Sequence, residues 1–168
     1  MNHWLLKTEP STFGIDDLER APGQTTSWEG VRNYQARNMI RDEMRVGDLA
    51  FLYHSSCPEP GIAAIVQVVR AGYPDSSAWR PRSPYLDAKS PENKPLWYTV
   101  DVRLKQRLAQ LLPLVQLRAH AADELDGLWL LRRGNRLSVM PMDARHWRFI
   151  LSLASTATKP KVAGRTRS

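Results

Sequence analysis

The chain has 168 residues, a formal net charge of +7 and a single cysteine, Cys57. This length suits one domain that buries roughly two thirds of its unfolded surface, so neither disulfides nor a metal are needed for stability. One cysteine excludes an internal disulfide and a cysteine-cluster metal site, and a lone thiol fits a reducing, cytoplasmic location. No apolar run approaches the length of a membrane span, so we expect no membrane partner.

In chain order, the first expected elements are a short strand and two helices. Residues 4–6 predict a strand that ends at a turn holding Pro10, because proline blocks a further ladder bond. Residues 15–20 begin with acidic side chains, which favour the start of a helix. Between Val31 and Glu43, apolar residues recur at helical spacing, which predicts a longer helix with its polar side chains off the apolar stripe.

Strands dominate the middle of the chain. Two continuous apolar runs flank a proline-containing loop, which predicts a hairpin with both faces covered. Residues 70–95 lack periodicity, and long ordered loops in compact domains are usually functional. Two later apolar runs predict two further strands. The second of these holds Pro141, so we expect it at the edge of the sheet. The expected strands after the first are residues 49–54, 62–69, 96–104 and 137–141.

The end of the chain predicts helices and a tail. Residues 115–125 favour short helical turns, and Asp143 is expected to cap a final helix. We therefore expect one α/β domain over residues 1–153, with a small curled sheet and helices packed outside. Residues 154–168 hold four basic residues and no acidic ones, which predicts a disordered basic tail. A positive field of this kind favours polyanions.

The segment from Trp28 to Asn38 carries the strongest functional signal. It places an aromatic side chain before a glycine turn and continues into a helix rich in amide and guanidinium groups. A flat π-surface beside amide and cationic donors suits a flat heterocycle, and for a basic protein a nucleobase is the commonest of these. The alternative interpretation is a core tryptophan followed by an amphipathic surface helix.

Signatures of catalysis and of cofactor binding are absent from the sequence. It has no glycine-rich loop of the dinucleotide or P-loop type, and its four histidines lack metal-ligand spacing. No nucleophile elbow or pair of carboxylates stands out. We therefore expect no cofactor, no metal and no catalytic residue. One alternative stays open, an enzyme that acts on a base or nucleotide with His54 as its proton-transfer group.

The remaining candidates divide into groups that would hold a base and groups that would hold phosphates. Candidates for stacking are Trp28, Tyr53, Trp79 and Trp97. Candidates for hydrogen bonds to a base are Lys7, Thr8, Ser11, Asn33, His54 and Ser55. Candidates for binding the phosphate backbone are Arg32, Arg37, Arg80, Arg82, Arg132 and Arg133. Two other roles stay open: Asn33 caps its own helix, or Lys7 pairs with an acidic neighbour.

Five stretches of the sequence stand out together. They are Trp4–Pro10, Trp28–Asn38, Gly47-Asp48, Tyr53-His54-Ser55 and Leu137–Pro141. In this order and spacing they resemble the EVE domain of the thymocyte nuclear protein family, over nearly the whole chain. The resemblance implies a PUA-like fold, a small curled mixed β-barrel flanked by helices. It also implies kinship with YTH domains, which hold a methylated adenine of RNA in an aromatic cage.

The same resemblance implies a function and a pocket. The function is a non-catalytic reader that encloses a modified base, such as 5-methylcytosine or 5-hydroxymethylcytosine in DNA, or a modified base of RNA. We expect a monomer whose partner is DNA or RNA, with a small-molecule or protein-binding module as a weaker alternative. Carried over by position, the pocket residues are Lys7, Thr8, Ser11, Trp28, Asn33, Tyr53, His54, Ser55, Trp79 and Ser138.

Overall fold

Six strands form one mixed sheet in the computed structural model, which describes residues 1–158. The strands are β1 (His3–Thr8), β2 (Thr25–Ser27), β3 (Leu49–His54), β4 (Gly61–Pro74), β5 (Tyr98–Pro113) and β6 (Val139–Met142). The sheet order is β2-β5-β4-β3-β1-β6. Strands β1 and β3 are parallel, and every other neighbouring pair is antiparallel.

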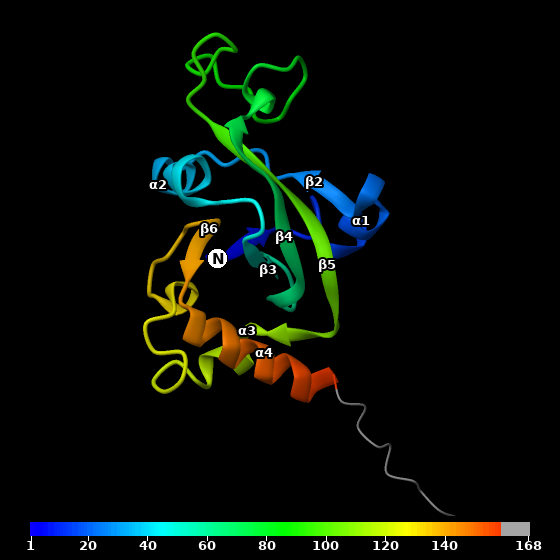
Figure 1. The fold of residues 1–168 in the computed structure, drawn as a ribbon, viewed down its shortest axis with the longest axis vertical. Helices are drawn as coiled ribbons and strands as arrows, with labels where there is room; N and C mark the ends of the chain where they lie inside the picture. Colours follow the sequence, from blue (N-terminus) through cyan, green and yellow to red (C-terminus); the bar gives the residue numbers. More distant parts are fainter. Residues whose placement is uncertain (159–168) are drawn as a thin grey trace, which may run out of the picture.

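The sheet curls but does not close (Figure 1), which corrects the expected barrel in this detail. Within the described residues, β2 and β6 are the two edges and do not pair with each other. Both edges are short, and Pro141 in β6 has no backbone N–H to donate to a further strand. The α/β class, the curled mixed sheet and the edge position of the last strand are confirmed.

Short helices connect and flank the strands. The α-helices are α1 (Ile15–Arg20), α2 (Tyr34–Asn38), α3 (Leu114–Arg118) and α4 (Ala144–Thr158), and the shorter or irregular turns are η1 (Pro22–Gln24), η2 (Met39–Glu43), η3 (Ser76–Ala78) and η4 (Trp129–Leu131). None of the described helices is long and apolar enough to cross a bilayer. Helix α4 continues through Thr158, past the boundary expected at residue 153, and the rest of the expected tail lies outside the described residues.

The helix expected over residues 31–43 is shorter and irregular. It begins at Tyr34 and changes at Met39 into a π-helical turn. The side chain of Asn33 accepts a hydrogen bond from the backbone N–H of Ala36 at 3.0 Å, so Asn33 is the N-cap. Apolar spacing predicted the buried face correctly, and the alternative role of Asn33 as the cap of its own helix is confirmed.

Strands β4 and β5 are much longer than the sequence predicted. Their pairing contains several register shifts, which interrupt the apolar pattern and bend the strands. The bent pair crosses the molecule and carries residues 75–97 at one end, next to α2 (Figure 1). Helices α3 and α4 lie at the other end. The long pair thus holds the aperiodic loop at a fixed place relative to the sheet.

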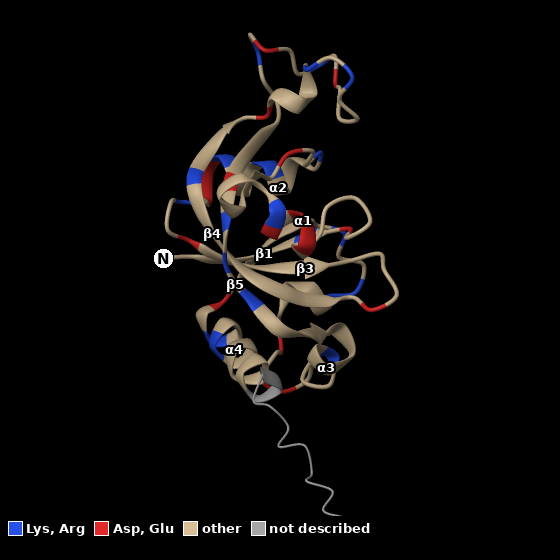
Figure 2. Cartoon of the chain, turned by 90° about the vertical axis from the view of Figure 1, so that its right-hand side faces the viewer, with Lys and Arg blue, Asp and Glu red and all other residues tan. Residues whose placement is uncertain are grey.

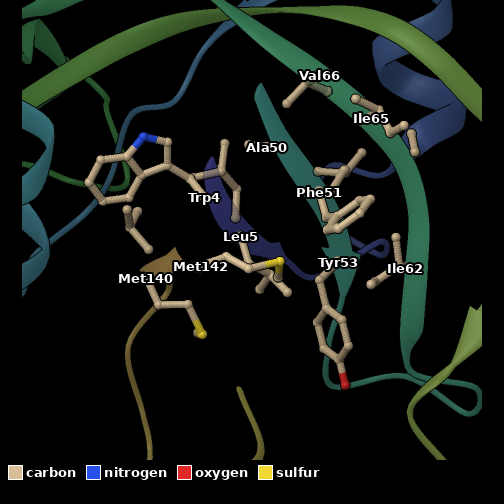
Figure 3. Packing of buried hydrophobic residues seen from close by; sticks show 14 of the residues in the cluster. Trp4, Leu5, Ala50, Phe51, Tyr53, Ile62, Ile65, Val66, Met140 and Met142 are labelled. Atoms are coloured by element: carbon tan, nitrogen blue, oxygen red, sulfur yellow. The ribbon is translucent and has the colours of Figure 1, made fainter. Parts of the chain in front are cut away.

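The hydrophobic core lies along β1, β3 and β6. Leu5, Phe51 and Met140 are fully or almost fully buried and pack together (Figure 3). The indole of Trp147 in α4 stacks on the Phe51 ring with 3.9 Å between ring centroids. Burial of such side chains stabilises each by about 2 kcal/mol. The core therefore fixes the carboxyl end of β1, where the candidate site begins.

One buried carboxylate ties the start of β1 to the start of β3. Asp48 accepts hydrogen bonds from the indole N–H of Trp4 at 3.0 Å and from the backbone N–H groups of Asn2 and Arg45 at 3.1 and 2.9 Å. Its side chain is almost completely buried. Because a buried donor without an acceptor is costly, three donors here depend on one residue.

We expect Asp48→Ala to lower the free energy of unfolding by about 3 kcal/mol, because it leaves the buried Trp4 indole N–H without an acceptor. Urea denaturation measures the change. The matched control is Asp42→Ala, whose carboxylate is exposed and forms an ion pair with the adjacent Arg41; we expect it to change stability little. Equal losses in the two variants would contradict the assigned role of Asp48.

Candidate nucleic-acid interface

A cavity of about 630 Å³ opens where the end of β1, the segment after β2 and the 75–97 loop meet. Its volume lies in the range of sites that hold small ligands, roughly 300–1,000 Å³. We call it the base cavity, after the expectation from the sequence that a nucleobase would bind here. Its lining residues are Lys7, Thr8, Glu9, Thr12, Phe13, Thr26, Ser27, Trp28, Glu29, Gly30, Val31, Arg32, Pro84, Tyr85 and Ser138.

Trp28 forms one wall of the base cavity. Its backbone N–H donates to the carbonyl of Val100 at 2.8 Å, which extends the pairing of β2 with β5 and fixes the residue. The residue is only 7% exposed. Its indole N–H has no acceptor in the described part of the chain, where every fully buried side-chain nitrogen or oxygen has a partner. The indole N–H therefore retains access to solvent, and the ring is not sealed inside the core.

Lys7 brings an unpaired cation to the same cavity. It lies at the end of β1 and is half-buried, and burial lowers the pKa of its amine. Its Nζ atom lies 6.0 Å from the centre of the Tyr53 ring. No carboxylate in residues 1–158 forms an ion pair with it, so the expected alternative pairing with an acidic neighbour is absent there. The amine is thus available as a hydrogen-bond donor to a ligand.

Hydroxyl and carboxylate groups complete the polar part of the lining. The Thr8 hydroxyl donates to the carbonyl of Phe13 at 2.6 Å, which leaves its oxygen free to accept. The carboxylate of Glu29 forms an ion pair with Arg80 at 2.8 Å. Ser138 enters the lining from the residue before β6. The base cavity therefore contains an indole ring, an ammonium group, hydroxyls and a carboxylate.

Tyr85 is the wall residue that the sequence analysis missed. It belongs to the aperiodic loop, where no pattern marked it, and it lies directly over Gly30. A Cβ atom on Gly30 would meet the Tyr85 ring at 2.6 Å, and the φ angle of Gly30 is +88°. Both observations require glycine at this position. The glycine turn after Trp28 was visible in the sequence, but its aromatic partner was not.

The buried carboxylate of Asp75 holds this loop in place. It accepts hydrogen bonds from the backbone N–H of Gly30 at 2.9 Å and from Nη1 of Arg32 at 3.1 Å. It also accepts from the backbone N–H of Ser77 at 2.9 Å. Burial acts to raise the pKa of Asp75, but the hydrogen bonds from Ser77, Gly30 and Arg32 outweigh it and hold the pKa below its ordinary value. The loop is thereby attached to the Trp28 segment.

Three arginines expected to bind phosphates have partners within the chain. Arg32 pairs with Asp75 and donates from Nη2 to the carbonyl of Tyr85 at 2.7 Å. Arg80 pairs with Glu29. Arg37 donates to a loop carbonyl at 3.1 Å and to the neighbouring amide side chain. These guanidinium groups stabilise the position of the 75–97 loop next to the cavity.

The other three expected phosphate-binding residues lie elsewhere. Arg82 is exposed in the 75–97 loop, which carries both basic and acidic residues (Figure 2). Arg132 and Arg133 follow η4 and line two neighbouring cavities rather than the base cavity. The expected set of arginines is therefore divided between two environments. The first three have side-chain hydrogen bonds or ion pairs within the chain, and the other three have none in residues 1–158.

Polar residues expected in the pocket also occupy other positions. Asn33 is the cap of α2 and faces a different cavity. The His54 Nε2 atom accepts a hydrogen bond from the backbone N–H of Ile15 at 3.1 Å, and burial is the main cause that lowers its pKa. Ser55 donates to a backbone carbonyl of β1 at 3.4 Å. These side chains satisfy backbone groups at the ends of helices and strands.

Three further expected residues lie outside the lining of the base cavity. Tyr53 lines a neighbouring cavity, with its hydroxyl at the end of the ring farthest from Phe51 (Figure 3). Ser11 is exposed in the turn after β1, and Trp79 is half-buried in the 75–97 loop. Of the ten expected pocket residues, the structure brings Lys7, Thr8, Trp28 and Ser138 together around one cavity.

The curled mixed sheet with flanking helices defines a PUA-like domain. The chain belongs to the EVE domain family, whose model, described as "EVE domain", matches residues 2–153. It is 40% identical over 166 residues to thymocyte nuclear protein 1 of Homo sapiens, which covers 90% of this chain and 73% of that protein. The corresponding protein of Gallus gallus is 42% identical over 166 residues, which covers 90% of this chain and 68% of that protein.

Solved structures agree with this assignment. A Pseudomonas putida protein is 46% identical with a TM-score of 0.85, and the match covers 90% of this chain and 99% of that one. Human THYN1 protein, solved in complex with 5-methylcytosine containing DNA, is 40% identical with a TM-score of 0.86. That match covers 92% of this chain and 98% of the human one. The fold expected from the resemblance is therefore confirmed at the level of the whole domain.

We expect Asp75→Asn to lower the free energy of unfolding by roughly 3 kcal/mol at neutral pH, because it leaves the partly buried Arg32 without its carboxylate. The lowered pKa of Asp75 means that its contribution is complete above the ordinary aspartate pKa and is lost as the pH falls through the folded value. The difference between wild type and variant should therefore shrink in acid, which denaturant titrations at a series of pH values measure.

The matched control for Asp75 is Asp123→Asn, since this carboxylate is exposed and makes no hydrogen bond in residues 1–158. The control should follow wild type at every pH. A stability difference between wild type and Asp75→Asn that stays constant from neutral pH down to about pH 2 would contradict the ionised state assigned to Asp75.

Proposed function

We propose that this protein is a non-catalytic reader that binds DNA containing a modified cytosine and encloses one base in the base cavity. The observation that carries the proposal is that Trp28 and Tyr85 both line one cavity, which is also lined by the Lys7 ammonium group without an ion-pair partner in residues 1–158. A second support is the human THYN1 protein, which is 40% identical and was solved in complex with 5-methylcytosine containing DNA. A modified base in RNA would present the same kind of ring and edge.

The lining suits the hydrogen-bonding edge of cytosine. That edge presents two acceptors, N3 and O2, and one donor, the N4 amino group. Lys7 and the indole N–H of Trp28 supply donors, and Glu29 supplies a carboxylate that accepts. A base removed from its stack is recognised in this way, by hydrogen bonds to its edge and by aromatic faces. Cytosine and its 5-substituted forms therefore match the polar groups better than a purely apolar cage would.

The free-energy cost of removing a base from the duplex and the gain from stacking it in the cavity are comparable. Removing a base from a duplex costs a few kcal/mol, and stacking on one aromatic side chain returns about 1–3 kcal/mol. Two aromatic walls can therefore offset much of the cost. Burial of one added methyl group contributes about 0.8 kcal/mol, which corresponds to about a fourfold preference for a methylated base. Discrimination of that size is measurable with short oligonucleotides.

The position of His54 favours binding over catalysis. Its Nε2 atom already accepts a hydrogen bond from the start of α1, and the residue does not line the base cavity. In the described part of the chain, no group of three or more His, Cys, Asp or Glu side chains could hold a metal ion. Mass spectrometry of nucleosides after incubation with modified DNA would detect turnover, and turnover abolished by His54→Ala would overturn this proposal.

We expect Tyr85→Ala and Trp28→Ala to reduce the preference for modified over plain cytosine from about fourfold or more towards one, because each removes a wall of the base cavity. Fluorescence anisotropy with matched DNA duplexes that differ only at one cytosine measures the ratio. Circular dichroism shows whether each variant is folded, and Tyr85→Ala is the milder change because Tyr85 is only half-buried.

The matched control is Trp79→Ala, since Trp79 is a tryptophan of the same loop that does not line the base cavity. We expect this variant to keep the wild-type preference. A preference that survives in folded Tyr85→Ala and Trp28→Ala would contradict enclosure of the base at this site. An RNA of the same sequence, measured alongside, shows which polymer is preferred.

A further inference from the structure

Two more cavities continue from the base cavity along the turn that precedes β6. The second, of about 660 Å³, shares Lys7 with the base cavity and is lined by Arg118, Arg132 and Arg133. The third, of about 390 Å³, shares Arg132 and Arg133 with the second and adds Arg136. Each cavity therefore shares lining residues with the next, and we refer to the series of three as a path along this turn.

The charges along this path are positive and unbalanced. Neither of the two further cavities has an acidic residue in its lining. In residues 1–158, no carboxylate lies within ion-pair distance of the four arginines that line them. Five other arginines do have carboxylate partners: Arg20, Arg32, Arg41, Arg80 and Arg107. Unbalanced guanidinium groups gathered in adjoining hollows favour a ligand with several negative charges.

The turn that carries three of these arginines has a fixed shape. The Asn135 side chain donates to the carbonyl of Trp129 at 2.6 Å and accepts from the backbone N–H of Leu137 at 2.9 Å. The Cζ atom of Arg132 lies 4.5 Å from the centre of the Trp129 ring, so a cation–π contact orients that guanidinium group. Preorganised donors lose less conformational entropy when they bind.

The turn also leads directly to the base cavity. Ser138 lines the base cavity, and its carbonyl accepts a hydrogen bond from the backbone N–H of Lys7 at 2.8 Å. Leu137, one residue earlier, lines the third cavity. A nucleic-acid strand that runs along residues 132–138 would thus place one nucleotide at the base cavity and the adjacent nucleotides over the arginines.

We propose that Arg118, Arg132, Arg133 and Arg136 form a phosphate track, which binds the sugar-phosphate backbone next to the enclosed base. This inference rests on the proposed function and specifies which protein surface contacts the sugar-phosphate backbone. The track supplies affinity without sequence information, because phosphates are the same at every position. The base cavity supplies the discrimination, so the two contributions are separable by experiment.

The test is the salt dependence of DNA binding by the full chain. Each phosphate contact contributes about 0.9 to the slope of log affinity against log salt concentration. We expect the double substitution Arg132→Ala with Arg133→Ala to lower that slope by about 1.8, which corresponds to about thirtyfold weaker binding at 0.15 M salt. The loss should be equal for DNA with 5-methylcytosine and for plain DNA, measured by anisotropy.

The matched control removes two charges elsewhere, with Arg103→Ala and Arg148→Ala. Both residues are exposed, and neither lines any of the three cavities. The control has the same net charge as the track variant, and we expect its slope to stay closer to that of wild type. The pair Arg132→Lys with Arg133→Lys should recover most of the slope, because lysine binds phosphate as a point charge.

A track variant with the wild-type slope, or a control variant with an equal loss, would overturn the phosphate track. Failure of the proposed function gives a different result, in which wild type binds modified and plain DNA alike while the slopes remain measurable. Binding of neither DNA by wild type would overturn both proposals. Arg132 and Arg133 are exposed, so their removal leaves the core intact, and a thermal melt checks this.

Discussion

The candidate site depends on one buried ionic interaction, the contact between the Asp75 carboxylate and the Arg32 guanidinium group. Without it, the only ion pair left in residues 1–158 between the 75–97 loop and the Trp28 segment would be the more exposed one of Arg80 with Glu29. Arg32 also donates to the carbonyl of Tyr85, so the same contact helps to hold Tyr85 over Gly30. A buried carboxylate is stable only when several donors surround it, and here the backbone N–H groups of Gly30 and Ser77 and the Ser77 hydroxyl complete the set. The same donors that stabilise the charge therefore determine where the cavity wall stands.

The arginines of this chain divide into two groups, with and without carboxylate partners in residues 1–158, that composition does not distinguish. Arg32 forms an ion pair with Asp75 and holds the loop in place, and Arg80 forms an ion pair with Glu29. Arg132 and Arg133 are on a surface turn that contains no carboxylate. A net charge of +7 says only that a polyanion is favoured. Which cationic side chains are available to a polyanion depends on where the acidic partners lie in three dimensions.

Much of the fold could be predicted from local patterns, and much of the site could not. The strand over residues 49–54 is continuous and apolar, and it was predicted with its observed bounds. Strand β4 was cut short at residue 69, because its register shifts interrupt the pattern that marks a strand. Trp28 was identified because the residues that mark it, the glycine turn and the polar helix, follow it directly in the sequence. Tyr85 was missed because the contact that gives it a role is made with Gly30, far away in sequence.

The cavity and the track differ in what each can recognise, and Lys7 is where they meet. An aromatic cavity distinguishes one base from another, because it contacts the groups that differ between bases. A row of guanidinium groups contacts the phosphates, which do not differ, so it cannot contribute to that choice. Lys7 lines both the base cavity and the second cavity, and no acidic group neutralises it in residues 1–158. In the proposed interface, its ammonium group would donate to a base edge or attract the adjoining phosphate, and it would thus link the two parts of the surface.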